Sequence, residues 1–355
     1  MLWIAVRLSK IWASAAGLMI AVSLAAAAAE QQPLTRIAFG SCADQNHQQP
    51  IWGRIFAYDP ELFIFAGDNV YGDDRSGTLS ELRGAYARAA KIPAIKRLRA
   101  TRPVLATWDD HDFGLNDAGR DFPNKRASEE LFLTHWGVAE DDPRRRRDGV
   151  YHEVTFGPEG RRVQIILLDT RFFRSTLKVT DERGVTGKEH YMPTSDPSKT
   201  MLGEAQWKWL QEQLLKPAEL RLIVSSIQVL AQGHGFERWG NLPKERQKLF
   251  GMVKETKANG VIFLSGDRHL GALYRQTDGV PYDLYEITSS GINRSYRNAD
   301  EPGPLRLGDV YRHENFGSID IDWSANTVTL AVRDMNGRDV RRVSISISSL
   351  RREHG

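Results

Sequence analysis

The feature that most constrains this chain is a repeated order of segments. A short apolar run is followed by a polar cluster and then by a pattern typical of a helix. Short apolar runs bounded by turn residues indicate strands that are buried on both faces. Strands that alternate with helices predict a layered α/β fold. The predicted buried strands are 36–40, 62–66, 103–107, 163–168, 222–224 and 261–264.

Helical spacing and β alternation complete the predicted architecture. Helices are predicted at 50–58, 78–99, 125–136, 204–215 and 244–258. Alternating segments at 282–288, 318–323, 327–333 and 342–348 predict C-terminal antiparallel strands, and the Asn336-Gly337 turn joins the last two as a hairpin. No repeat or low-complexity linker interrupts the chain, so we expect residues 30–355 to form a single catalytic domain with two packed sheets covered by helices.

The first 29 residues have the composition of a signal peptide. Arg7 and Lys10 precede an uncharged stretch that ends in Ala27-Ala28-Ala29, an A-x-A cleavage pattern. We therefore expect export to the periplasm or the extracellular space. A retained membrane anchor is the alternative, because the uncharged stretch reaches the shortest length that spans a bilayer, roughly 17 residues. No later apolar run is long enough to span one.

Charge and cysteine content exclude some classes of protein. The 48 Lys and Arg residues nearly balance the 45 Asp and Glu residues, so no electrostatic case exists for a dedicated nucleic-acid-binding surface. Cys42 is the single cysteine, so no intrachain disulfide can form. A free thiol in an oxidising compartment must be buried or bound to a metal. The oligomeric state is left open.

Four polar clusters directly follow four of the predicted strands. They are Gly-Ser-Cys at 40–42, Gly-Asp-Asn-Val-Tyr at 67–71, Trp-Asp-Asp-His-Asp at 108–112 and Gly-Asp-Arg-His at 266–269. The ends of strands in one sheet lie close together, so these clusters are expected to meet. Several carboxylates in one pocket repel one another strongly unless cations lie between them. The sequence therefore predicts a site for two or more metal ions.

The donor types suggest which metals and which reaction. Thiolate and phenolate suit a ferric ion, and a carboxylate-rich neighbouring site suits a hard divalent ion. Metal pairs are a recurrent device for hydrolysing phosphate esters. Two other functions remain open on these residues alone. One is a hydrolase that uses paired carboxylates, such as Asp110 and Asp112, without metal. The other is a non-catalytic metal- or phosphate-binding protein of the cell envelope.

Taken in order, the four motifs resemble the alkaline phosphatase D (PhoD-like) family of calcineurin-like metallophosphoesterases, over residues 36 to about 295. The resemblance implies a four-layer α-β-β-α sandwich of the metallophosphoesterase type. It also implies a secreted phosphoesterase that hydrolyses phosphomonoesters, phosphodiesters or both through a metal-bound hydroxide. The implied cofactors are Fe³⁺ and a second divalent metal, Ca²⁺ first and Mg²⁺, Mn²⁺ or Zn²⁺ as alternatives. The implied partner is a phosphate-ester substrate.

The resemblance also assigns roles to single residues. Cys42, Tyr71 and His269 would bind the iron and Asp68 would bridge the metals. Asp110 and Asp267 would bind the second metal, and Asn116 would fill an outer calcium position. His111 would act on the phosphoryl group or leaving oxygen, and Arg171 would bind phosphate oxygens. The implied set is thus Cys42, Asp68, Tyr71, Asp110, Asn116, Asp267 and His269 for metal, and His111 and Arg171 for catalysis.

Other polar residues carry weaker expectations. Asp109 is expected to cap a turn or to orient His111, and Asp112 is expected to act similarly. His234 is a candidate metal ligand by position only. The segment 237–243 resembles a family segment at the rim of the pocket. The remaining histidines in the chain after the leader are expected to be structural: His47, His135, His152, His190 and His313.

Overall fold

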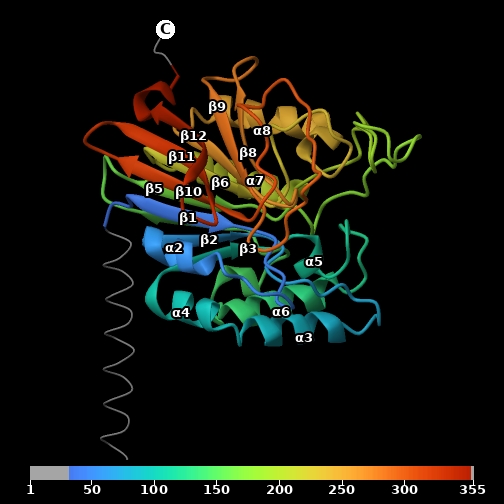
Figure 1. Ribbon diagram of the computed structural model, residues 1–355. Coiled ribbons are helices and arrows are strands. Elements are labelled where there is room, and N and C mark those ends of the chain that lie inside the picture. The colour runs from blue at the N-terminus through green and yellow to red at the C-terminus, as the bar shows by residue number, and fades with distance from the viewer. Residues whose placement is uncertain (1–31, 353–355) are drawn as a thin grey trace, which may run out of the picture.

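The computed structural model describes residues 32–352, and it contains two six-stranded sheets packed face to face (Figure 1). In the first sheet, β1, β2 and β3 run parallel, and the C-terminal strands extend it as an antiparallel meander. In spatial order its strands are β12 (Asp339–Ser346), β11 (Thr327–Asp334), β10 (Asn315–Asp322), β1 (Arg36–Gly40), β2 (Leu62–Ala66) and β3 (Val104–Thr107).

The second sheet has a parallel centre and antiparallel edges. In spatial order its strands are β4 (His152–Phe156), β5 (Val163–Leu167), β6 (Leu220–Ser225), β7 (Val261–Ser265), β9 (Leu284–Ser289) and β8 (Gly271–Gln276). Its central strands are buried on both faces, which explains their nearly continuous apolar sequences.

Helices cover the outer face of each sheet, as Figure 1 shows for the group below the first sheet. The helices over the first sheet are α2 (Trp52–Tyr58), α3 (Ser80–Ala89), α4 (Pro93–Thr101), α5 (Asp110–Phe113) and α6 (Lys125–Trp136). Those over the second sheet are α7 (Gly203–Leu214) and α8 (Pro243–Glu255). Short 3₁₀ turns occur at Pro143–Arg145, Trp239–Asn241 and Ile347–Ser349.

Three apolar layers hold this arrangement together. Between the sheets, side chains such as Phe39 and Ile64 pack against Ile165 and Leu222 of the opposite sheet. The other two layers lie between each sheet and its helices. Successive strand residues point to opposite faces, so one strand contributes to two layers. The predicted four-layer α-β-β-α sandwich is confirmed, as are the antiparallel strands β10, β11 and β12 and the hairpin at Asn336-Gly337. The segment predicted at 282–288 is β9 of the second sheet, where it runs parallel to β7 and antiparallel to β8.

Most element predictions hold within a few residues, with two kinds of error. The single helix predicted at 78–99 is wrong: the chain forms α3 and α4, because Pro93 starts a new helix at its first position. The strands β4 and β8 were not predicted. β4 has partly exposed, charged residues, and β8 ends in Arg275 and Gln276, so neither forms a long apolar run.

The predicted signal peptide, residues 1–29, lies outside the described residues. Within residues 32–352, no helix combines the length and the hydrophobicity that a bilayer crossing requires.

Candidate active site

The four polar clusters of the sequence meet where strand ends of the two sheets approach one another. The backbone is so close here that a Cβ atom on Gly266, after β7, would lie 2.4 Å from Ser41 Oγ and 3.0 Å from the carbonyl oxygen of Ala66. Only glycine fits this position without displacement. The second sheet can therefore deliver Asp267 and His269 to the loops of the first sheet.

One group of ligand-type atoms surrounds the carboxylate of Asp68. The Sγ atom of Cys42, a carboxylate oxygen of Asp68 and a ring nitrogen of His269 all lie within 4.8 Å of one another. Cys42 Sγ is 3.5 Å from Asp68 Oδ2, and the Tyr71 hydroxyl donates to the same oxygen at 3.2 Å. His269 Nδ1 is buried and has no hydrogen-bond partner among the described residues. Thiol, phenol, imidazole and carboxylate thus converge on one point.

A second group of carboxylates adjoins the first through Asp110. Asp109, Asp110 and Asp267 bring carboxylate oxygens within 4.8 Å of one another, and so do Asp110, Asp117 and Glu237. Asp68 and Asp110 also group with His111. Carboxylate oxygens at this spacing are the ligands that hard divalent cations prefer.

Most members of these groups line one small cavity, the inner cavity, of about 110 Å³, whereas Cys42, Tyr71 and Asp109 are not part of its lining. Its lining includes the predicted residues Asp68, Asp110, His111, Asn116, Asp267 and His269. Asn116 thus lies beside the carboxylates of the second group. Glu237, the first residue of the segment 237–243 that was expected at the pocket rim, lines the cavity. Asp117 and Tyr296 also line it, and the sequence did not single them out.

The backbone is strained at the proposed metal ligands. Cys42, Asp68, Asp267 and His269 have φ values of 60°, 49°, 67° and 55°. Non-glycine residues rarely adopt this left-handed conformation, and each instance costs roughly 1–3 kcal/mol. Four such residues around one cavity indicate that side-chain placement outweighs local backbone preference. This strain is typical of functional sites.

Burial and charge repulsion disfavour the ionised forms of the acidic side chains in the site. Burial raises the pKa of Asp68 well above its usual value, and the neighbouring Asp110 carboxylate raises it further. Burial likewise raises the pKa of Asp267, although Arg268 opposes the shift. The Cys42 thiol has a raised pKa because it is buried beside Asp68. Bound cations would favour the charged forms of all these groups, so the donor set fits metal ions.

His111 is held by an aspartate that the motifs did not identify. Its Nδ1 lies 2.8 Å from Asp73 Oδ1, while its backbone N–H donates to Asp110 Oδ1 at 2.9 Å. Burial alone would lower the pKa of His111, but the carboxylates of Asp110 and Asp68, together with the bond to Asp73, raise it to about 11. The ring therefore carries a proton in this arrangement, and Asp73 fixes its orientation.

Arg171 lies beside the cavity but is fully buried and already paired. Its Nε donates to Asp109 Oδ1 at 2.6 Å, and its Nη1 contacts Glu237 Oε2 at 2.5 Å. Arg174 contacts the other oxygen of Glu237 at 2.7 Å. The predicted contact of Arg171 with phosphate stays a prediction, and in this structure the guanidinium orders the carboxylates behind the cavity.

Asp109 and Asp112 tie the motif loops together. Asp109 precedes α5 and forms a capping box with Asp112, whose Oδ1 accepts from the Asp109 N–H at 2.6 Å. Asp112 also accepts from the backbone N–H of Asp68 at 3.1 Å. Asp109 stands at the N-cap position, and the bond that closes the turn is accepted by Asp112. The side chain of Asp109 holds Arg171 and Ser226 rather than His111.

His234 does not join the ligand groups described above. It is fully buried, its Nε2 lies 2.9 Å from Gln228 Oε1, and its Nδ1 accepts from the backbone N–H of Phe236 at 3.2 Å. Both ring nitrogens are thus occupied within the protein. His190, which we expected to be structural, lies in the lining of the inner cavity.

A sequence model of the PhoD-like phosphatases matches residues 37–316. The chain belongs to the PhoD-like phosphatase family. One relative, alkaline phosphatase D of Bacillus subtilis (strain 168), is 25% identical over 238 residues, which are 61% of this chain and 40% of the relative. The chain thus matches well under half of that relative's length. The predicted family is confirmed.

Solved structures support the same fold. A structure of PhoD superposes with a TM-score of 0.69 at 18% identity, covering 89% of this chain and 69% of that chain. Purple acid phosphatase PPD1 from yellow lupin (Lupinus luteus) seeds superposes with a TM-score of 0.61 at 11% identity, covering 89% of this chain and 54% of that chain. These similarities confirm the metallophosphoesterase-like fold.

Proposed function

We propose that this protein is an exported, metal-dependent phosphoesterase that hydrolyses phosphomonoesters, phosphodiesters or both. The observation that carries the proposal is the convergence of Cys42, Tyr71 and His269 on the Asp68 carboxylate, next to the acidic group around Asp110. A buried thiol, phenol and imidazole around a carboxylate make a poor hydrolytic site without a cation but a good ligand set for one. Membership in a phosphatase family supports the same function.

The residues divide into two ligand sets. Cys42, Tyr71 and His269 would hold Fe³⁺, with Asp68 shared between the ions. Asp110 and Asp267, with Asn116 nearby, would hold a divalent ion, for which Ca²⁺ is our first choice over Mg²⁺, Mn²⁺ and Zn²⁺ because the donors are oxygens. Bound cations supply Lewis-acid polarisation of the phosphoryl oxygens and lower the pKa of water.

The chain's own residues would orient the ester and donate a proton to its departing oxygen. In the hydrolysis, a water oxygen bonds to phosphorus and loses one proton to solvent. The bond from phosphorus to the ester oxygen breaks, and the departing oxygen takes one proton, so the protons balance. His111 lines the inner cavity, and Asp73 occupies its Nδ1, so Nε2 is the nitrogen that donates this proton. Arg171 fixes Asp109 behind the cavity and Glu237 in its lining, which makes it a positioning residue in this proposal.

Elemental analysis of the as-isolated protein, combined with turnover of 4-nitrophenyl phosphate and its bis(4-nitrophenyl) diester, tests the proposal. We expect iron and a divalent metal, and turnover that a chelator abolishes. Asp68→Asn should lose metal and activity, whereas Leu215→Ala, exposed at the end of α7, should keep both. Metal with tight phosphate binding but no turnover would favour the non-catalytic alternative. Chelator-insensitive hydrolysis would favour the metal-free one.

A further inference from the structure

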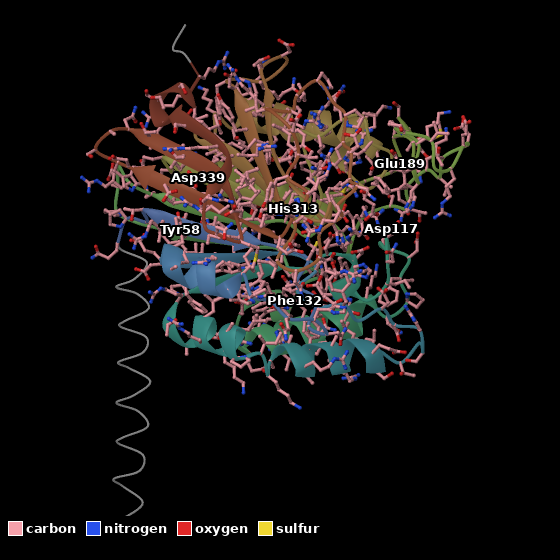
Figure 2. All side chains as sticks on the ribbon, viewed as in Figure 1. Tyr58, Asp117, Phe132, Glu189, His313 and Asp339 are labelled. Atoms are coloured by element: carbon pink, nitrogen blue, oxygen red, sulfur yellow. The ribbon has the colours of Figure 1, made fainter. Side chains whose placement is uncertain are left out.

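A second, larger cavity adjoins the inner one. This outer cavity has a volume of about 520 Å³, and it shares Phe236, Arg268 and Tyr296 with the lining of the inner cavity. Glu189 and the 295–300 loop also line it. Figure 2 shows Glu189 on the projecting loop after β5, on the same side of the molecule as Asp117, which lines the inner cavity. The inner cavity has room for little more than a phosphoryl group, so the rest of a substrate has to extend beyond it.

Tyr296 gives the outer cavity a flat aromatic surface next to the metal ligands. Its ring stacks on the His269 imidazole with centroids 4.2 Å apart and an angle of 6° between the planes. The backbone N–H of Tyr296 donates to the His269 carbonyl oxygen at 2.9 Å, which fixes this segment. The side chain is nevertheless 52% exposed. Because the imidazole covers one face of the ring, the other face is the one left for a ligand.

The charged groups around the outer cavity already have protein partners. Arg268 is buried and contacts Glu301 at 2.5 Å, and its guanidinium lies 4.0 Å from the Phe236 ring centroid. Two further groups have charged partners: Arg297 pairs with Glu314, and Asp300 lies near Arg312. Glu189 accepts from two backbone N–H groups and forms no ion pair among residues 32–352. Its negative charge disfavours a second anionic group on the substrate.

Neutral polar groups complete the lining. Ser295 has a buried hydroxyl with no hydrogen-bond partner among residues 32–352, and Thr186 and Asn298 add further donors and acceptors. A buried hydroxyl without a partner is unfavourable unless a ligand or water satisfies it. The lining therefore suits a neutral ligand that has both a planar ring and hydroxyl or amide groups. A volume of about 520 Å³ lies within the usual range for small-molecule pockets, roughly 300–1,000 Å³.

We propose that the outer cavity binds the nucleoside part of a phosphate ester, with the base stacked on the free face of Tyr296. This inference rests on the proposed phosphoesterase function and specifies its substrate class. A nucleoside combines the features that the lining selects: a planar ring, no net charge, and hydroxyl and amide groups. Glycerol esters have the hydroxyls but no ring to stack.

The test compares three phosphomonoesters of primary alcohols: adenosine 5′-monophosphate, ribose 5-phosphate and glycerol 3-phosphate. The bond that breaks is of the same type in each, so differences in kcat/KM report on the leaving group. We expect adenosine 5′-monophosphate to exceed ribose 5-phosphate by about tenfold or more, the size of effect that one base stacked on an aromatic side chain produces. Tyr296→Ala should bring this ratio close to one, and Tyr296→Phe should preserve it.

The ratio separates the role of Tyr296 in substrate binding from its contact with His269. Damage transmitted through His269 would lower both rates and leave the ratio intact, which would overturn the inference. Equal kcat/KM values for the three esters in the wild-type protein would also overturn it, with the phosphoesterase function retained. If only diesters react, the adenosine and glycerol 4-nitrophenyl diesters replace the monoesters. Metal-loaded protein that hydrolyses none of these esters would refute the inference, and the function would be refuted as well if 4-nitrophenyl phosphate and its bis(4-nitrophenyl) diester were also left intact.

Discussion

Arg171 offers the most direct measure of how the buried charges around the site are balanced. The residue has 0% exposure, and its guanidinium lies between the carboxylates of Asp109 and Glu237. Methionine keeps much of its aliphatic volume but removes the charge. In Arg171→Met, Glu237 would still have Arg174 as a cationic partner at 2.7 Å. Asp109 would lose its cation, and its remaining side-chain partner would be the Ser226 hydroxyl at 2.7 Å. Breaking a buried pair by removing one partner destabilises a protein by about 3–5 kcal/mol.

We therefore expect Arg171→Met to lower the free energy of unfolding by about 3–5 kcal/mol, measured by urea denaturation with tryptophan fluorescence in the presence of the metals. Adding Asp109→Asn to this variant removes the unpaired charge and should recover roughly 1–2 kcal/mol. Arg126→Met is the matched control, because Arg126 is 60% exposed and an exposed pair contributes at most about 1 kcal/mol. A loss at Arg171 no larger than that at Arg126 would refute this reasoning.

Three further predictions address the metal ligands, the strand ends and the pH dependence of stability. Tyr71→Phe should remove the visible tyrosinate-to-iron absorption of the purified protein. Its iron content, measured by elemental analysis, should stay above that of Asp68→Asn. Identical visible spectra of Tyr71→Phe and the wild type would contradict a phenolate ligand. Gly266→Ala should reduce the metal content and destabilise the protein by about 1–3 kcal/mol, because the added Cβ atom would lie 3.0 Å from a backbone oxygen. Gly53→Ala is the control: its Cβ atom would meet open space, so this variant should show no destabilisation in thermal unfolding. Burial lowers the pKa of His135 to about 4, so as the pH falls below about 6.5 this histidine takes up a proton in the unfolded chain before it does so in the folded protein. Between pH 7 and 5 the free energy of unfolding of the wild type should therefore fall by roughly 2 kcal/mol more than that of His135→Phe. Equal losses in the two proteins would contradict the lowered pKa.

Much of the fold follows from local patterns. The central strands have nearly continuous apolar sequences because both of their faces are covered. This pattern can be recognised in a single segment, without the rest of the chain. β4 and β8 are the two edge strands of the second sheet, where residues such as Glu153 and Arg275 break the apolar run. A strand of this kind is defined by its pairing partner, which a single segment does not reveal. The division between α3 and α4 is a local signal at Pro93.

The candidate site divides in the same way. Residues that directly follow strands, such as Cys42 and Asp68, are visible in the sequence because strand and cluster are contiguous. Asp73 and Tyr296 reach the site from loops, and only the packing of those loops brings them there. Glu237 was indicated by the resemblance of the segment 237–243 rather than by a strand end. Asp73 follows Tyr71 by two residues, and Asp117 follows Asn116 directly, so proximity to a motif was the one available signal for them. Tyr296 had no such signal.

The two parts of the site therefore have different physical origins. The proposed metal-binding side chains lie at strand ends. There, close backbone approaches such as that at Gly266 and left-handed residues such as Asp68 leave these side chains little freedom to change position. The leaving group meets loop residues, of which Tyr296 is the most exposed aromatic. Loops change with little effect on the core. It follows that substitutions in the 295–300 loop should alter which esters are hydrolysed, whereas substitutions at the strand ends should alter whether any ester is hydrolysed.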